Sequence, residues 1–268
     1  MNKFLLGAVS VVAMATSASA ADLAARPYAK APPAPLAVAY DWSGFYVGLN
    51  GGGGWSDKCW DITQNGTNVF LNPARAEGCH NASGGTVGGQ IGYRWQSSAW
   101  VFGVEAQGNW ANFSASNNSL FSVAPAGTFY NRSRVDAFGL FTGQVGYAWD
   151  KFLLYGRGGV AVTSDKYEGF LNAAFRGFLA GTVFDRATET RWGGVVGIGG
   201  EYALTSNWSL ALEYDHLFMG TNNLMLISTG TIGNAAGVVS RADNIRQDVD
   251  IVTARVNYRF GGPVVAKY

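Results

Sequence analysis

Two cysteines and a histidine lie close enough in the sequence to suggest chemistry. Cys59 and Cys79 are the only cysteines of the 268-residue chain, and His80 follows directly. With Asp57 or Asp61 they would form a metal site, but two cysteines without tight spacing are a weak zinc pattern. Because the first twenty residues have the pattern of an export signal, we expect a Cys59–Cys79 disulfide, with free thiols as the alternative.

The second histidine, His216, follows Glu213 and Asp215 and raises the question of a catalytic group. Nucleophilic catalysis needs a Ser or Cys beside the histidine, and no His-x-Ser occurs here. The run GRGGVA at 156–161 matches a loose dinucleotide fingerprint, but it lies inside an expected strand and precedes no helix. We therefore expect no enzymatic activity, no metal and no cofactor, and a lipid-modifying enzyme is the weakest alternative. His216 is interpreted as part of an upper aromatic girdle.

The chain begins with segments that are typical of export. Residues 1–20 have one early charge, an apolar run too short to span a bilayer, and Ala18-Ser19-Ala20 before the expected cleavage site. Residues 21–40 hold four of the seven prolines and are predicted to be a Pro/Ala-rich linker. Without Lys3 the mature chain has 18 basic and 18 acidic residues, so its charge does not favour a nucleic acid partner.

From Trp42 onward the sequence alternates between apolar and polar residues, which indicates strands with two different faces. Trp100, Phe102 and Val104 share one face, and Glu105 and Gln107 share the other. Each alternating stretch exceeds the ~9 to 11 residues that a tilted strand needs to cross a membrane. The expected strands are roughly 42–56, 83–96, 99–113, 133–149, 151–164, 189–203, 207–220 and 247–260.

The connections and an internal repeat indicate an up-and-down barrel. Short turns alternate with long loops at 57–82, 114–132, 165–188 and 221–246, which is the outer-membrane barrel pattern. GQIGYRW and GQVGYAW place tyrosines at 93 and 147, and further tyrosines follow at 202 and 258, at intervals of 54, 55 and 56 residues. Every second strand then ends in one aromatic girdle, expected to contain Tyr93, Trp95, Tyr147, Trp149, Tyr202, Tyr258 and Phe260.

The face opposite the aromatic stripe carries the strand charges. On the fourth strand this predicts that Val135 faces lipid and Asp136 faces inward. Charges in so narrow an interior must be paired, so we expect a polar plug. A soluble lipocalin-like barrel would reverse the pattern, and a small-solute porin would need a wider bore. The expected interior network is Arg94, Glu105, Asp136, Arg157, Arg191, Glu201, Glu213, Asp215, Arg255 and Arg259.

The third long loop is the strongest candidate for binding. Its apolar residues between Phe170 and Leu179 recur at helical spacing, although Gly169, Gly177 and Gly181 oppose a stable helix. Packing against the other loops is one interpretation. A ligand-binding or adhesive patch, for haem or a host surface, is the alternative.

Several motifs together resemble the alpha-proteobacterial outer-membrane immunogenic proteins, within the opacity-like and outer-membrane-protein-A-like barrels. They are ASAADL at the cleavage site, YDWSGFYVGLNGGGGW at the start of the barrel, the two GQ-I/V-GY strand ends and the final VNYRF. The resemblance implies an eight-stranded antiparallel transmembrane β-barrel that is exposed on the surface of a Gram-negative cell. It also implies a role in envelope integrity and recognition by host immunity.

The expected organisation is a signal peptide at 1–20, a periplasmic linker at 21–40, a barrel at 41–260 and a periplasmic tail at 261–268. Both termini of the mature chain are expected in the periplasm. The expected partners are outer-membrane lipids and lipopolysaccharide, the barrel assembly machinery, and a host or ligand contacted through the loops. No nucleic acid partner is expected.

Overall fold

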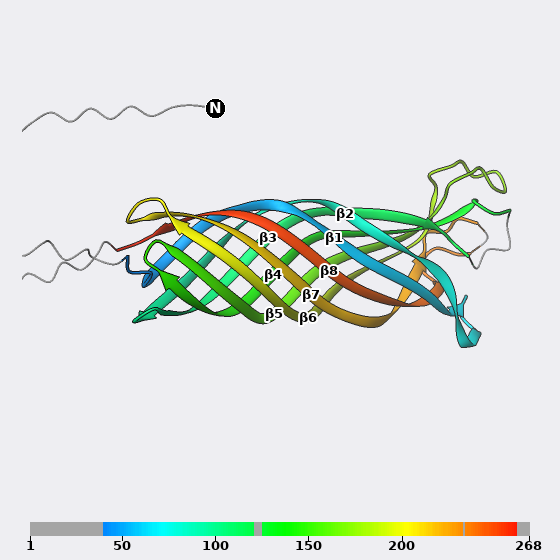
Figure 1. Cartoon of the computed structure of the whole chain (residues 1–268). Coiled ribbons are helices and arrows are strands. Elements are labelled where there is room, and N and C mark those ends of the chain that lie inside the picture. The colour runs from blue at the N-terminus through cyan, green and yellow to red at the C-terminus, as the bar shows by residue number, and fades with distance from the viewer. Residues whose placement is uncertain (1–39, 121–124, 233, 262–268) are drawn as a thin grey trace, which may run out of the picture. The chain divides into compact units, whose positions relative to one another are not determined.

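A closed ring of eight antiparallel strands forms the whole of the folded unit (Figure 1). The computed structural model describes residues 40–120, 125–232 and 234–261. Within these ranges, no helix is long and apolar enough to cross a membrane. The predicted eight-stranded barrel is confirmed. The strands are β1 (Gly44–Asn65), β2 (Val69–Ser97), β3 (Trp100–Asn118), β4 (Phe129–Trp149), β5 (Phe152–Leu171), β6 (Val183–Ala203), β7 (Trp208–Ser228) and β8 (Val239–Arg259).

Pairing between the first and last strands closes the ring. β1 and β8 pair from Tyr46 opposite Arg259 to Asn65 opposite Arg241, so no edge is left open along most of their length. Tight turns join β2 to β3, β4 to β5 and β6 to β7 at one end. Both ends of the described chain lie at this same end (Figure 1), because Tyr40 donates to Asp150 in the β4–β5 turn and Arg259 donates to Asn207 in the β6–β7 turn.

The strands continue well beyond the ends that the sequence predicts. Residues 57–82, expected as a long loop, are almost entirely a hairpin, because β1 runs to Asn65 and β2 begins at Val69. Residues still alternate between the two faces there, but the large apolar side chains now point inward instead of outward. Lys58, Trp60 and Ile62 are buried inside, whereas the intervening outward residues are polar or partly exposed. An outward strand face that meets water carries no stripe of apolar residues. The apolar pattern therefore predicts strands that end earlier than the observed ones.

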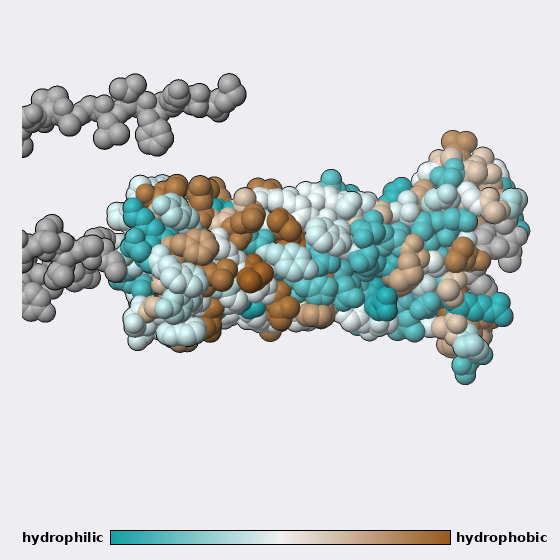
Figure 2. Space-filling view, viewed as in Figure 1, coloured by the Kyte–Doolittle hydropathy of each residue, from teal (hydrophilic) through white to brown (hydrophobic). Residues whose placement is uncertain are grey.

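The outer surface therefore has two zones. Hydrophobic residues gather over the half of the barrel nearer the tight turns, and hydrophilic residues follow beyond them (Figure 2). We call the first zone the apolar belt. It is bounded at the turn end by the aromatic girdle and at the other end by the exposed tryptophans Trp55, Trp110 and Trp192. The sequence predicts that the belt faces lipid.

The bore is filled in layers. Along β8 the inward residues change from Arg255 to Ile251 and Val249 and then to Gln247, all of them buried. Every strand except β1 contributes at least one buried apolar residue to the same layer. The apolar layer contains Ala82, Phe113, Val135, Phe138, Leu140, Ala161, Val195, Leu217, Met219, Val249 and Ile251. The interior is thus partly apolar, where the sequence predicts a polar plug alone.

Placing an arginine in the apolar belt tests this division of the surface. Val145 is exposed in the middle of the belt, and Val145→Arg should destabilise the barrel by about 2 to 4 kcal/mol in lipid vesicles. Thr190→Arg, at an exposed position beyond the belt and opposite the uncharged Ser164, should change stability by less than about 0.5 kcal/mol. Urea titrations of the two variants measure the difference. Equal effects would contradict the assignment of the belt.

Candidate functional site

Five buried charges form a cluster in the bore on the turn side of the apolar layer. The Arg157 guanidinium lies 2.8 Å from Glu105, 2.7 Å from Glu213 and 2.5 Å from Asp215. Arg255 lies 2.5 Å from Glu105 and also contacts Glu213. We call these five residues the central cluster. They come from β3, β5, β7 and β8, so two guanidinium groups cross-link four strands through three carboxylates.

Two tyrosines complete the hydrogen bonds of the central cluster. The Tyr46 hydroxyl donates to Glu105 at 2.6 Å, and the Tyr155 hydroxyl donates to Glu213 at 2.8 Å. Each ring lies over a glycine: a Cβ atom at Gly92 would be 2.5 Å from Tyr46, and one at Gly199 would be 2.5 Å from Tyr155. The second glycine of GQIGY is therefore inward and makes room for an aromatic ring. In the second copy of the motif, a Cβ atom at Gly146 would lie 2.7 Å from the Leu154 carbonyl oxygen, so close packing also limits this position.

A second ion pair closes the bore toward the tight turns. Arg94 lies 2.8 Å from Glu201, and its guanidinium is 4.5 Å from the centre of the Tyr46 ring. Arg259 faces inward as well, but its partners are carbonyl oxygens, including that of Ser206 at 2.7 Å. The buried Trp42 donates its ring N–H to the Asp150 carbonyl at 3.0 Å. The segment before β1 therefore covers this end of the barrel.

Further buried charges lie beyond the apolar layer, some of them in segments that were expected to be loops. Arg191 is buried and pairs with Glu189 at 2.8 Å, apart from the central cluster. Lys58 and Asp165 form a fully buried pair at 2.6 Å, which the sequence analysis missed. Extending the period-two alternation past residues 56 and 164 would have placed both residues inside.

A third group of charges surrounds Arg241 near the outer end. Its guanidinium lies 3.0 Å from Asp185, 3.5 Å from Asp243 and 3.7 Å from Glu77. Neither carboxylate oxygen of Asp243 has a hydrogen-bond partner among the described residues, and burial raises the pKa of this side chain to about 7. Sequence analysis missed this group as well, because it lies in segments that were expected to be loops.

The expected inward position of Asp136 is wrong. Its carboxylate contacts Arg134 and Lys166 at 2.6 Å each, and both of these cations are exposed on the outside of the barrel. The register shifts between Val135 and Ala137, so Asp136 is the extra residue of a β-bulge. A bulge reverses which alternate residues face inward, and Val135 is consequently buried inside rather than exposed to lipid.

The aromatic girdle residues lie on the outside at the turn end. Tyr93, Trp95, Tyr147, Trp149, Tyr202 and Phe260 are exposed, and Tyr258 packs against Trp208 with ring centres 5.0 Å apart. Trp100 and Phe152 extend the girdle across the tight turns. Trp100 lies 5.5 Å from Tyr147, and Phe152 lies 6.1 Å from Trp149. Neighbouring strands thus supply rings to one continuous band.

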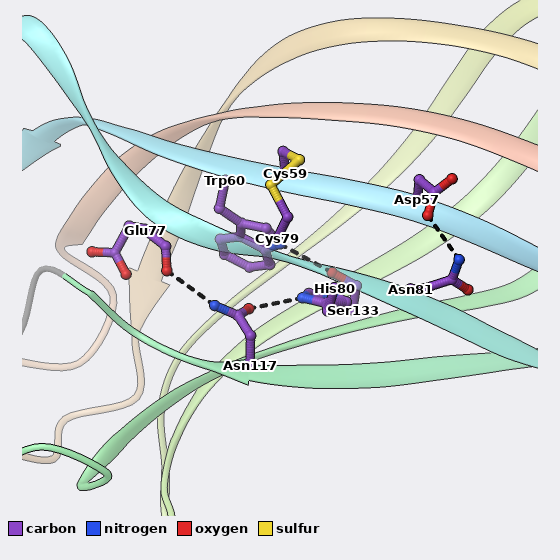
Figure 3. The surroundings of a disulfide bond; sticks show 9 residues. All are labelled: Asp57, Cys59, Trp60, Glu77, Cys79, His80, Asn81, Asn117 and Ser133. Carbon is purple, nitrogen blue, oxygen red and sulfur yellow. Dashed lines mark hydrogen bonds between the residues drawn. A yellow bond between two sulfur atoms is a disulfide. The ribbon is translucent and has the colours of Figure 1, made fainter.

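The disulfide lies within the β1–β2 hairpin rather than in a loop (Figure 3). Cys59 and Cys79 are directly opposite each other, with sulfurs 2.08 Å apart. The His80 ring bonds to Asn117 at 2.8 Å, and burial lowers the pKa of this histidine. Asp57 accepts a hydrogen bond from Asn81 at 2.8 Å. In the described ranges no three or more His, Cys, Asp or Glu side chains are grouped to hold a metal ion.

His216 lies on the outer surface with an acidic partner. Its ring nitrogen Nδ1 is 2.7 Å from Asp250, which also accepts a hydrogen bond from the Tyr214 hydroxyl at 2.5 Å. The ring packs against Phe218 with centres 4.3 Å apart. The contacts of His216 with the described residues include no Ser or Cys, so this arrangement has no nucleophile.

The outer end combines a cavity with exposed apolar tips. The cavity has a volume of about 220 Å³ and is lined by Glu77, Asp185 and Arg241 together with Phe129 and Phe184. The third loop forms a tight turn rather than a helix, because the backbones of Phe175 and Phe178 bond to each other. Arg176 and Gly177 between them have positive φ angles, as in a type I′ turn. The exposed apolar tip residues are Val69, Phe70, Leu120 and Leu179.

Comparisons with known proteins agree on the kind of barrel. The sequence matches the family described as outer membrane protein beta-barrel domain over residues 6–260. It is 32% identical to the 31 kDa outer-membrane immunogenic protein of Brucella melitensis biotype 1, covering 84% of this chain and 90% of that protein. It is 28% identical to outer membrane protein P1 of Coxiella burnetii, covering 94% and 96%. The crystal structure of OprG from Pseudomonas aeruginosa shares the fold, with a TM-score of 0.54, 14% identity and coverage of 84% and 99%.

Removing one cation from the central cluster should destabilise the barrel strongly. Arg255→Met leaves Glu105 and Glu213 with fewer partners in a buried site, which should cost about 3 to 5 kcal/mol of unfolding free energy. Arg186→Met, at an exposed position outside the barrel, should cost about 0 to 1 kcal/mol. Denaturant titration in detergent micelles compares the two variants. A loss of less than 1 kcal/mol for Arg255→Met would contradict a structural role for the cluster.

Proposed function

The chain belongs to the outer membrane protein beta-barrel domain family, and from that premise we propose that it is a structural surface barrel that conducts no solute. The observation that carries this proposal is the filled bore. The central cluster joins four strands by ion pairs of 2.5 to 2.8 Å, and the apolar layer lies beyond it. Eight strands enclose little more than the volume of their own side chains, so no continuous aqueous path remains.

The role in the envelope that we propose is mechanical rather than chemical. A barrel whose eight strands form a closed ring and are joined by internal ion pairs is a rigid unit in the outer membrane. The arrangement at His216 supplies a carboxylate and a hydroxyl from tyrosine but no nucleophile beside them, which argues against lipid-modifying chemistry. The filled bore argues in the same way against a small-solute porin.

We propose that the tight turns and both chain termini face the periplasm. Outer-membrane barrels have short periplasmic turns and longer outer connections, and residues 40 and 261 lie with the short turns. The predicted signal peptide at 1–20, the Pro/Ala-rich linker at 21–40 and the tail at 261–268 lie outside the described residues, except for Tyr40 and Gly261. In this orientation the aromatic girdle meets the inner leaflet, and lipopolysaccharide surrounds the upper belt. The final strand, which ends in Tyr258 and Phe260, is the segment that we expect the barrel assembly machinery to bind.

Planar-bilayer recording tests the filled bore. The refolded full chain should give no stable conductance, whereas Leu140→Gly combined with Leu217→Gly should open a small one, because both side chains are buried in the apolar layer. Val145→Gly, which removes an outward side chain of the adjacent region, is the control and should stay silent. Wide and stable conductance of the unmodified chain would overturn the proposal.

The outer end favours a second candidate function, namely contact with a ligand or a host surface. Exposed apolar side chains such as Phe70 and Leu179 are costly in water and usually mark a contact. Cells that display the chain should bind haem or host-cell surfaces, and Phe70→Ser with Leu179→Ser should reduce that binding at least threefold. Thr67→Ala, near the tip of the first hairpin, is the matched control. Unchanged binding in the double variant would remove the tips from this role.

A further inference from the structure

Charged residues on the outside of the barrel beyond the apolar belt separate by sign. β1 and β8 carry Asp57, Asp61, Asp248 and Asp250, with Arg246 as the one cation. β4, β5 and β6 carry Arg132, Arg134, Lys166 and Arg186, with Asp136 and Glu168 as anions. The first set, which we call the acidic face, has a net charge of −3, and the second, the basic face, has a net charge of +2.

Each face contains two like charges in direct opposition. Asp57 is the cross-strand partner of Asp248, and Arg134 is the cross-strand partner of Lys166. Like charges directly opposite in a sheet destabilise it. On the basic face, Asp136 lies 2.6 Å from both cations and offsets this cost. On the acidic face, Asp57 accepts a hydrogen bond from the neutral amide of Asn81, and no cation among the described residues forms an ion pair with Asp57 or Asp248.

The two faces lie on opposite sides of the barrel at similar heights. In a closed ring of eight, the β8–β1 pair and the β4–β5 pair are four strands apart. Asp57 is two residues beyond Trp55, and Lys166 is four residues beyond Val162, the cross-strand partner of Trp192, so both lie just beyond the outer boundary of the apolar belt. Copies in one membrane share their orientation, so they can meet only side by side with equal heights in contact.

We propose that copies of this chain associate side by side in the outer membrane, with Asp57 and Asp248 of one copy paired to Arg134 and Lys166 of the next. A second copy satisfies the acidic pair, because it presents two exposed cations at the same height. The contact joins two different faces that point in opposite directions, so it is heterologous and propagates as a row instead of closing as a dimer. The pairs are exposed, so salt should weaken the association.

The surface below the charges permits close approach. Gly143 and Gly158 are directly opposite each other on the basic side, and Gly51 lies on the acidic side. A Cβ atom at any of the three would meet nothing closer than 3.6 Å, so packing within the barrel does not require glycine there. Because these glycines have no side chains, the surfaces of neighbouring barrels can approach each other closely there. Similar glycines such as Gly108 occur on other strands, so the charges rather than the glycines select the faces.

Zero-length crosslinking tests the contact directly. Lys166 is an exposed lysine on this part of the surface, whereas Lys58 is buried and Lys151 lies in a tight turn at the other end. In outer membranes that contain unlabelled and ¹⁵N-labelled full chains, carbodiimide should join Lys166 of one copy to Asp57 or Asp248 of another. Mass spectrometry should find mixed-isotope peptides of this kind. Their absence, with only the Lys166–Asp136 link within one chain, would overturn the proposal.

Charge-reversal variants distinguish a second copy of the chain from other partners of the two charged faces. Energy transfer between copies labelled through Ser206→Cys in vesicles should fall at least threefold in Asp57→Lys with Asp248→Lys, and equally in Arg134→Glu with Lys166→Glu. A chain with all four changes should recover the transfer, because its faces are again complementary. Ser83→Lys with Asn112→Lys, on exposed positions of β2 and β3 between the two faces, is the control and should change nothing. Heat-modifiable migration checks that every variant is folded.

If the chain with all four changes does not recover the energy transfer, the proposal is overturned. The two faces would then be assigned to lipid phosphates and divalent cations. Vesicles with and without lipopolysaccharide distinguish that case, because association between copies should persist without it. The proposal rests on the outer-membrane location but not on the filled bore. Conductance and association are measured separately, so either can fail alone.

Discussion

The closed hydrogen-bonded ring is the constraint on which the rest of the structure depends. A strand in hydrocarbon cannot leave its backbone groups unpaired, so β8 must return to β1, and it does so over nearly the whole length of both strands. Eight strands then enclose a bore of fixed and narrow width. Every second side chain must enter this space, which leaves little room for water and forces each inward charge to find a partner.

The interior meets this constraint by combining large side chains with glycines. Tyr46 and Tyr155 reach across the bore because Gly92 and Gly199 stand where their rings lie. The tyrosines in turn donate to carboxylates that bind Arg157 and Arg255. Breaking one member of such a network is costly, although the network as a whole need not exceed an apolar filling in stability. The apolar layer farther along the bore shows that the same chain uses both solutions.

The polarity of the outward side chains changes along the barrel, although the strands themselves continue without interruption. Over the belt the outward residues are apolar and the interior contains the central cluster and much of the apolar layer. Beyond the belt the outward residues are polar, and the interior contains buried ion pairs such as Lys58–Asp165 and the charges around Arg241. The Cys59–Cys79 disulfide joins two strands in this outer part, where no lipid supports the hairpin. The same outer part holds the two faces of opposite charge, so the association between copies and the contact with ligands that we propose both depend on strands that extend beyond the belt.

Much of this barrel is determined by the sequence alone. The period-two alternation, the tyrosines at intervals of about 55 residues and the pattern of short and long connections specify eight strands, their order and the aromatic girdle. They also place Glu105, Arg157, Glu213 and Arg255 inside, because regular pleating sends alternate residues to one face.

The tertiary structure decided what lies beyond regular pleating. One bulge at Asp136 moved that residue outward and Val135 inward, because an extra residue reverses the alternation. The strands outside the belt, with Lys58 paired to Asp165 and Arg241 to Asp185, were hidden because their outward residues meet water and carry no apolar stripe. Which charge meets which depends on how far each strand is shifted against its neighbours. That register is set by the closure of the whole ring, so no single strand's sequence contains it.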